Sequence, residues 1–76
     1  MSILLQIMNH MLSNLEYSVV DVDCAFTDIE NGDESLSDLC YGIGFDPTPS
    51  QLKMAEKSIK NWKSALHATA MKLNLN

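Results

Sequence analysis

Residues 3–30 read ILLQIMNHMLSNLEYSVVDVDCAFTDIE, and one set of apolar residues in this stretch recurs at alternating steps of three and four. The members of the set are Leu5, Met8, Leu12, Leu15, Val19, Val22, Phe26 and Ile29. Residues with this spacing fall on one face of an α-helix. Gly32 follows soon after, and glycine tolerates the left-handed backbone that ends many helices. The pattern therefore predicts one long helix over about residues 3–30.

Part of this predicted helix also fits a β-strand. Within residues 17–27, apolar side chains alternate with polar or small ones, which is the pattern of a half-buried strand. The alternating positions are Val20, Val22, Cys24 and Phe26. Helix is favoured because the helical series continues unbroken through the segment, and because the chain has no second strand-like run for pairing. The sequence leaves helix and strand both open for residues 17–27.

A short helix is predicted over about residues 34–42. Asp33 or Ser35 can cap its first turn, because both side chains accept hydrogen bonds from free backbone N–H groups. Gly42 and Gly44 lie where this helix should end. The short helix therefore connects two longer segments.

The clearest local signal in the chain is Thr48-Pro49-Ser50-Gln51. Thr48 fits the N-cap of a helix, Pro49 fits its first position, and Gln51 fits the capping box. Apolar residues then recur by three and four almost to the end of the chain, with lysines roughly opposite them. This pattern predicts a second long helix over about residues 49–73.

Together these elements predict an all-α fold, with a single helical domain over residues 1–76. Two long helices joined by a compact connector should pack as an antiparallel helical hairpin. A chain this short buries only about 60% of its unfolded surface, so a lone hairpin would be marginally stable. We therefore expect the hairpin to complete a bundle by dimerisation or by binding a partner.

One end of this hairpin carries more apolar surface than its single seam can bury. The residues concerned are Ile3, Leu4, Ile7, Met11, Met71 and Leu75. In an antiparallel hairpin, the start of the first long helix and the end of the second lie together. A contiguous apolar surface of this kind marks a contact with another chain. We expect these six residues to form the interface with a partner protein or with a second copy in a homodimer.

Charge is divided between the two halves of the chain. The net charge is −5, all five lysines lie from Lys53 onward, and there is no arginine. This composition argues against direct binding of nucleic acid or of an anionic membrane surface, because both require clustered basic residues. The residues that predict an acidic surface are Asp21, Asp23, Asp28, Glu30, Asp33 and Glu34. These acids either pair with the lysines of the second long helix or face a basic partner.

No residue pattern indicates catalysis or a cofactor. His10 and His67 lie off the apolar faces, and we expect both to face solvent. A zinc site needs three or four convergent ligands, which neither histidine has nearby in the sequence. Cys24 and Cys40 match no metal or redox spacing, so we expect two free thiols in a reducing cytoplasm, with one disulfide as the alternative. We expect no enzyme activity, metal, cofactor, small-molecule substrate or membrane span.

The leading functional hypothesis is a small, acidic, non-enzymatic protein–protein interaction module. It would act as an adaptor, a chaperone-like partner or an inhibitor of a larger protein, of a kind common among phage and mobile-element products. One alternative is an acidic nucleic-acid mimic that occupies the basic groove of a DNA- or RNA-binding protein. Another is a structural homodimeric bundle whose short helix and proline-rich turn form a recognition tip.

Overall fold

The computed structural model describes residues 2–14 and 17–75 of the chain. Its elements are α1 (Ile3–Asn14), α2 (Val19–Glu30), α3 (Leu36–Gly42), α4 (Pro49–Lys57), the 3₁₀ turn η1 (Ile59–Asn61) and α5 (Trp62–Lys72). No strand occurs within these described ranges, so the all-α prediction is confirmed. The strand interpretation is wrong for the residues that lie in α2.

The long helix expected over residues 3–30 is two helices. α1 ends at Asn14, and α2 begins after the N-cap residue Ser18. The Ser18 hydroxyl accepts a hydrogen bond from the Asp21 backbone N–H at 3.1 Å, and the Asp21 carboxylate accepts one from the Ser18 backbone N–H at 3.0 Å. This capping box satisfies two backbone donors at the start of α2 and so favours a new helix there. Leu15, a member of the apolar series, lies outside the described residues.

The second long helix, expected over residues 49–73, is also interrupted. α4 ends at Lys57, and η1 separates it from α5. The Ser58 hydroxyl donates to the Met54 carbonyl at 2.8 Å, and the Ser58 backbone N–H is shared between the carbonyls of Met54 and Ala55. A serine hydroxyl bonded to the carbonyl four residues earlier bends a helix, and a 3₁₀ turn redirects the chain. The bend lets α4 contact α1 and α3 while α5 contacts α1 and α2.

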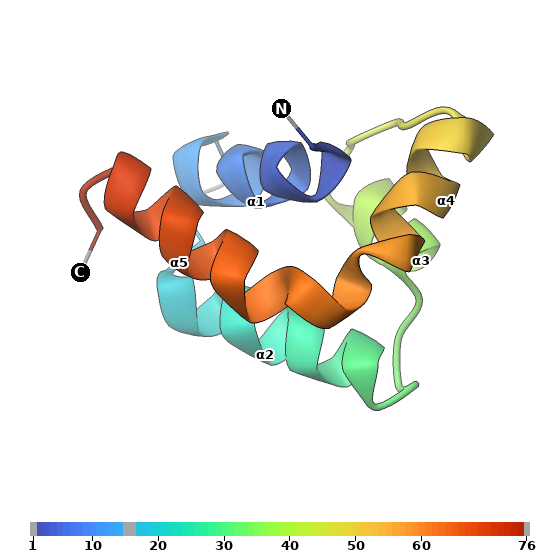
Figure 1. The fold of residues 1–76 in the computed structure, drawn as a ribbon, viewed down its shortest axis with the longest axis horizontal. Helices are drawn as coiled ribbons and strands as arrows, with labels where there is room; N and C mark the ends of the chain where they lie inside the picture. The colour runs from blue at the N-terminus through green and yellow to red at the C-terminus, as the bar shows by residue number, and fades with distance from the viewer. Residues whose placement is uncertain (1, 15–16, 76) are drawn as a thin grey trace.

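The arrangement of the helices differs from the expected two-helix hairpin. α1 and α2 run in opposite directions, and α5 lies across both of them (Figure 1). α3 and α4 gather at the end of the molecule away from the C-terminus (Figure 1). The longest dimension of the chain is 31 Å, whereas a straight helix over residues 3–30 would be about 42 Å long. The two breaks therefore fold the chain back into a bundle of shorter helices.

One hydrophobic core joins the five described α-helices. The largest fully buried side chains are Trp62, Phe26, Ile7, Met8, Met11 and Val22. The rings of Phe26 and Trp62 stack with their centroids 6.0 Å apart, which fixes α5 against α2. α3 adds Leu36 and Leu39 to the same core, and α4 adds Ala55. The short connecting helix is therefore part of the core and not a loose linker.

Three of the helices end at a residue in the left-handed conformation. The residues are Gly32 after α2, Gly44 after α3 and Asn74 after α5, with φ angles of 82°, 71° and 60°. In each case the next backbone N–H donates to the carbonyl five residues earlier, at 2.8–2.9 Å. This pairing satisfies carbonyl groups that a helix end leaves free. The stop predicted at Asn31-Gly32 is confirmed.

Candidate functional site

The apolar residues predicted to contact a partner are divided between the core and the surface. Leu4, Ile7 and Met11 are 2%, 0% and 1% exposed and belong to the hydrophobic core. Ile3 is partly buried against the same core. The flank of α1 is covered within the chain, because α1 packs against α2, α4 and α5. A two-helix hairpin would leave this flank of α1 exposed for a second chain. In the observed bundle, other helices of the same chain bury it.

Met71 and Leu75 are the members of the predicted interface that lie at the surface. Met71 is 61% exposed and Leu75 is 36% exposed. Both lie at the C-terminal end of α5, where Leu75 lines a groove together with Val19 of α2. The end of α5 therefore lies beside the start of α2, so the six predicted residues do not form one continuous surface.

The predicted acidic surface is divided into two rows along α2. One side of the helix carries Asp21 and Asp28, and the other carries Asp23 and Glu30. The two members of each pair share a side because residues seven apart nearly coincide at 100° per residue. The last two acids, Asp33 and Glu34, lie in the turn before α3. All six are at least partly exposed, but they do not form a single face.

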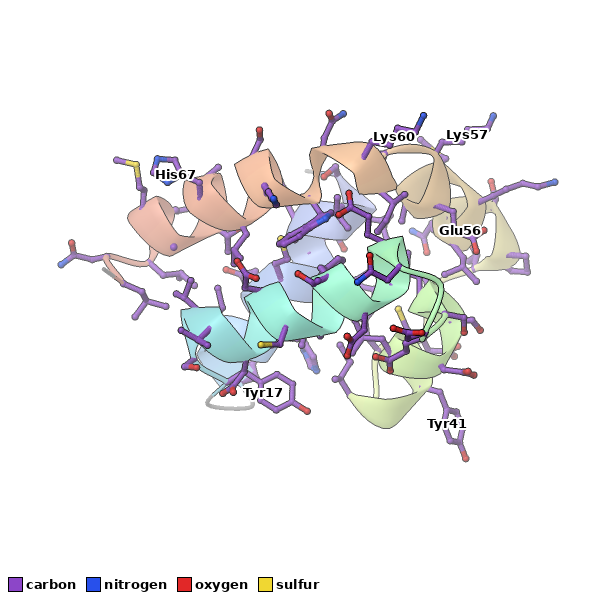
Figure 2. The ribbon with its side chains drawn as sticks, turned by 90° about the horizontal axis from the view of Figure 1, so that it is seen from below. Tyr17, Tyr41, Glu56, Lys57, Lys60 and His67 are labelled. Atoms are coloured by element: carbon purple, nitrogen blue, oxygen red, sulfur yellow. The ribbon has the colours of Figure 1, made fainter. Side chains whose placement is uncertain are left out.

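The lysines do not pair with these acids in the described part of the chain. Figure 2 shows Lys57 and Lys60 projecting from the side of the molecule opposite Tyr41. Across residues 2–14 and 17–75, no lysine forms an ion pair with a carboxylate. The ammonium group of Lys63 lies over the Trp62 ring, 5.6 Å from its centroid. Pairing of the acidic half with the basic half is therefore not found in this part of the chain.

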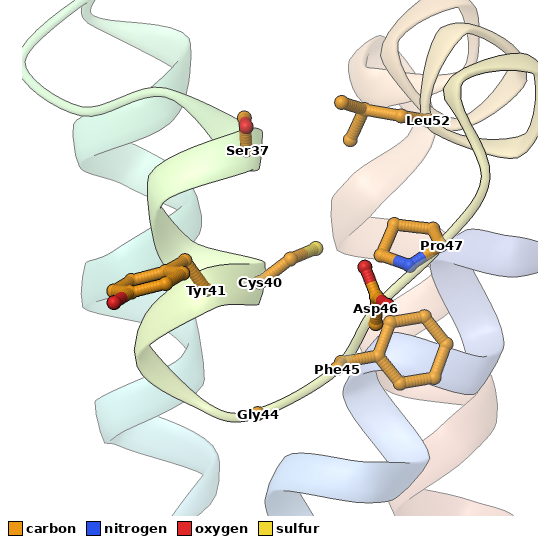
Figure 3. A pocket seen from close by; sticks show the side chains of 8 residues that line it. All are labelled: Ser37, Cys40, Tyr41, Gly44, Phe45, Asp46, Pro47 and Leu52. Carbon is orange, nitrogen blue, oxygen red and sulfur yellow. The ribbon is translucent and has the colours of Figure 1, made fainter.

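A groove of about 470 Å³ lies between α3 and the segment that leads into α4. We call it the α3–α4 groove. From α3 it is lined by Ser37, Cys40 and Tyr41. From the facing wall it is lined by Phe45, Asp46, Pro47 and Leu52. In Figure 3 the Cys40 side chain points across the groove toward the facing wall, whereas the Tyr41 ring points away on the outer side of α3.

Helix caps and a glycine turn fix the backbone of both walls of the α3–α4 groove. The Ser35 hydroxyl caps α3 by accepting from the Asp38 backbone N–H at 3.0 Å. Gly44 then turns the chain back, because its φ of 71° suits glycine. Thr48 and Gln51 form the predicted capping box of α4, with reciprocal hydrogen bonds of 2.9 and 3.1 Å. Both walls are therefore anchored by capped helix ends.

His10 of α1 contacts two residues at the end of the groove, Ile43 and Phe45. Its Nε2–H donates to the Ile43 carbonyl at 3.0 Å, since its Nδ1 accepts from the Asn14 side-chain amide at 3.3 Å. The ring also contacts Phe45, with the two centroids 5.8 Å apart. The prediction that His10 faces solvent is therefore wrong, because this residue is half-buried and ties α1 to the end of α3. His67 is exposed, as predicted.

The lining of the α3–α4 groove combines a buried thiol, apolar side chains and one carboxylate. Burial raises the pKa of the Cys40 thiol, which keeps the sulfur protonated and weakly nucleophilic at neutral pH. Phe45, Pro47 and Leu52 make the facing wall largely apolar. Asp46 is exposed and supplies a negative charge to this wall. The groove can therefore take an apolar side chain next to a basic group.

Tyr41 places an exposed aromatic ring on the outer side of α3, beside the groove. Its side chain is 90% exposed, on a helix whose inner face is buried. Asp38 precedes it by three residues, which places the carboxylate on the same side of α3. Tyrosine is enriched among the residues that dominate protein interfaces, and its ring attracts cations. An exposed aromatic ring and a carboxylate therefore share this side of α3.

The sequence predicts this region only in part. The short helix and the proline-rich turn enter the predictions only as the recognition tip of the homodimer hypothesis. Phe45 was not singled out, because its place in the groove depends on contact with His10, far away in the sequence. The sequence feature that could have indicated the groove is the proline-rich turn after Tyr41.

The rest of the described surface shows no cluster of metal ligands. Within residues 2–14 and 17–75, no three His, Cys, Asp or Glu side chains come together as a metal ion requires. The helices in this part of the chain are too short or too polar to cross a bilayer. Comparison with models of known protein families, with characterised proteins and with solved structures gives no match.

Proposed function

We propose that this chain is a small, acidic, non-enzymatic protein-binding module, acting as an adaptor or inhibitor of a larger protein. The observation that carries the proposal is the α3–α4 groove, with its largely apolar facing wall and the exposed Asp46 carboxylate. The exposed side chains of Tyr41 and Asp38 lie on α3 beside it. These features fit a partner segment in which an apolar residue lies close to lysine or arginine. The net charge of −5 would assist the approach of such a segment.

The expected affinity for a short segment is modest. An apolar side chain that buries roughly 100 Å² in the groove contributes about 2.5 kcal/mol. A cation over the exposed Tyr41 ring contributes about 0.5–1 kcal/mol. Loss of translational and rotational freedom opposes both gains. A short peptide should therefore bind in the micromolar to millimolar range, and a whole partner protein more tightly through additional contacts.

An acidic nucleic-acid mimic is the second candidate. It is supported by the two rows of acids on α2, which carry no ion pairs to described lysines. Such a mimic would bind the basic groove of a nucleic-acid-binding protein, and its affinity would fall steeply with added salt. Binding through the α3–α4 groove would depend less on salt, because much of it comes from apolar contact.

A structural homodimer has less support. The chain exposes 4921 Å², whereas a monomeric protein of its mass is expected to expose about 4,650 Å². The accessible surface of the chain is therefore close to that expected of a monomer of this mass. The exposed large hydrophobic residues that a dimer could bury include Val20, Met54, Met71 and Leu75.

The proposal is tested by selecting binders from a library of random displayed peptides. Peptides enriched on the parent protein should combine an apolar residue with a nearby lysine or arginine. Tyr41→Ala should weaken their binding at least about fivefold, which is the loss of 1 kcal/mol that defines an important interface residue. Tyr17→Ala is the matched control, because Tyr17 is 38% exposed and lies outside the groove.

Three outcomes contradict the proposal. The first is that no peptide is enriched on the folded parent protein. The second is that the enriched peptides bind the Tyr41→Ala and Tyr17→Ala variants equally well. A requirement for acidic peptides would also contradict it, since the groove carries negative charge.

A further inference from the structure

A second groove, of about 360 Å³, lies between the start of α2 and α5. We call it the α2–α5 groove, and it is separate from the α3–α4 groove. Val19, Leu66, Ala70 and Leu75 give it apolar walls. Its polar groups belong to Trp62, Lys63, His67 and Asp23. A volume of this size falls within the range of sites that bind small ligands.

The Trp62 indole in the wall of this groove has an unused hydrogen-bond donor. The residue is 1% exposed, and its Nε1–H is buried without an acceptor among the described residues. Buried polar groups in folded proteins nearly always have a partner, and a buried tryptophan N–H usually finds one. The ring is fixed by stacking on Phe26. The unused donor therefore has a fixed position in a residue that lines the groove, and neighbouring atoms of the chain cover it.

A positive charge lies over the face of the same ring. The Lys63 ammonium is 5.6 Å from the centroid of the Trp62 ring and forms no ion pair with a described carboxylate. An N–H donor and an ammonium group on one wall together favour an anionic acceptor. Asp23 is the opposing charge in the lining, and one of its oxygens accepts from the Thr27 hydroxyl at 3.4 Å.

We propose that the α2–α5 groove binds an aliphatic carboxylate. The carboxylate pairs with the Lys63 ammonium and, as the atoms that cover the indole move aside, accepts a hydrogen bond from the Trp62 N–H. The aliphatic chain lies against Leu66, Ala70 and Leu75. An aliphatic amine could approach Asp23, but it would leave both donors without an acceptor. A small inorganic anion would leave the apolar walls uncovered.

The first experiment compares octanoate with octylammonium, which share an eight-carbon chain and differ in the sign of the charged end. Trp62 is the only tryptophan, so its fluorescence and its single indole N–H signal in NMR report directly on the groove. Octanoate should change the fluorescence with saturation and move the indole proton downfield, as a new hydrogen bond requires. Octylammonium should do neither.

Lys63→Met tests the charge contact and keeps most of the side chain's length. It should weaken octanoate binding by at least about tenfold, since hydrogen bonds to charged groups are the stronger ones. Lys57→Met is the matched control, because Lys57 is an exposed lysine that lies outside the groove. It should bind octanoate like the parent protein.

The carboxylate could come from a free acid or from the C-terminus of another protein. An acetylated tripeptide ending in leucine, tested beside its C-terminal amide, distinguishes these sources. Stronger binding of the free-carboxylate peptide than of octanoate identifies a protein C-terminus. Stronger binding of octanoate identifies a free acid.

The inference is overturned if octanoate saturates neither signal, or if octylammonium binds equally well. It is also overturned if octanoate binds without moving the indole proton, or if Lys63→Met binds as well as Lys57→Met. A long-lived water on the indole N–H of the free protein would likewise overturn it, because the donor would already be satisfied. Tyr41→Ala should leave octanoate binding unchanged, so this test is independent of the proposed protein-binding function.

Discussion

Replacing Ile7 by alanine separates the observed bundle from the expected hairpin. In the bundle Ile7 is 0% exposed and belongs to the central core. In the hairpin the same residue would lie on an uncovered apolar flank and bind a second chain. In the bundle, Ile7→Ala should therefore lower the free energy of unfolding of the single chain. In the hairpin, the substitution would leave that free energy unchanged and would weaken binding to the second chain.

The magnitude follows from the burial of the side chain. Truncating a fully buried isoleucine to alanine costs about 2–5 kcal/mol, because hydrophobic contact is lost and a cavity remains. A domain of 76 residues is stable by only about 4–11 kcal/mol in total. A loss of about 3 kcal/mol should lower the melting temperature by roughly 12–24 °C. Much of the total stability is therefore removed by this one substitution.

The assay is urea unfolding, followed by Trp62 fluorescence and by far-UV circular dichroism. Val20→Ala is the matched control, because Val20 is 69% exposed on α2. Its free energy of unfolding should stay within about 0.5 kcal/mol of the parent value. An Ile7→Ala variant as stable as Val20→Ala would refute the placement of α1 in the core.

Three further predictions concern pH, thiol chemistry and helix ends. Hydrogen bonds from the backbone and side chain of the N-cap serine lower the pKa of Asp21 below its ordinary value of 3.8. Ionised Asp21 therefore stabilises the fold above that pH, and Asp21→Asn should be less stable than the parent at pH 7, with the difference shrinking in acid-unfolding curves as the pH falls below 3.8. Cys24 is exposed and Cys40 is buried with a raised pKa, so an aromatic disulfide reagent should modify one thiol quickly and the other only on unfolding; two equally fast reactions would contradict this. Gly44→Ala should cost about 1 kcal/mol in urea unfolding, because the φ of 71° strains alanine while the added methyl group meets no neighbour. Gly42→Ala, in the last turn of α3 with equal space around it, should be neutral or stabilising, and equal losses at both glycines would contradict the explanation.

The parts of the fold that depend on local chemistry could be predicted from the sequence. The stop at Asn31-Gly32 and the start at Thr48 each rest on a few adjacent residues, and both are found. The break before α2 was also predictable, because Ser18 and Asp21 have the spacing of a capping box. It was missed because apolar residues keep a helical spacing on both sides of it. Continuous spacing therefore does not prove a continuous helix.

The parts that depend on distant contacts could not be predicted in this way. Ser58 is an ordinary helix residue in the sequence, and only its bond to the Met54 carbonyl marks the bend before α5. Without that bend, α1 seemed to need a second chain to cover Ile7. The α3–α4 groove likewise depends on His10 holding Phe45 and the Ile43 carbonyl. Helix spacing alone cannot reveal contacts of this range.

The most direct test of the central claim is to locate a selected peptide on the protein. Backbone amide signals of the ¹⁵N-labelled protein are followed by NMR during titration with the best peptide from the displayed library. The proposed function predicts that the largest shifts fall on residues 37–47 and on Leu52, and that Tyr41→Ala weakens them. Shifts centred on the acidic rows of α2 or on the α2–α5 groove, with residues 37–47 unchanged, would contradict it.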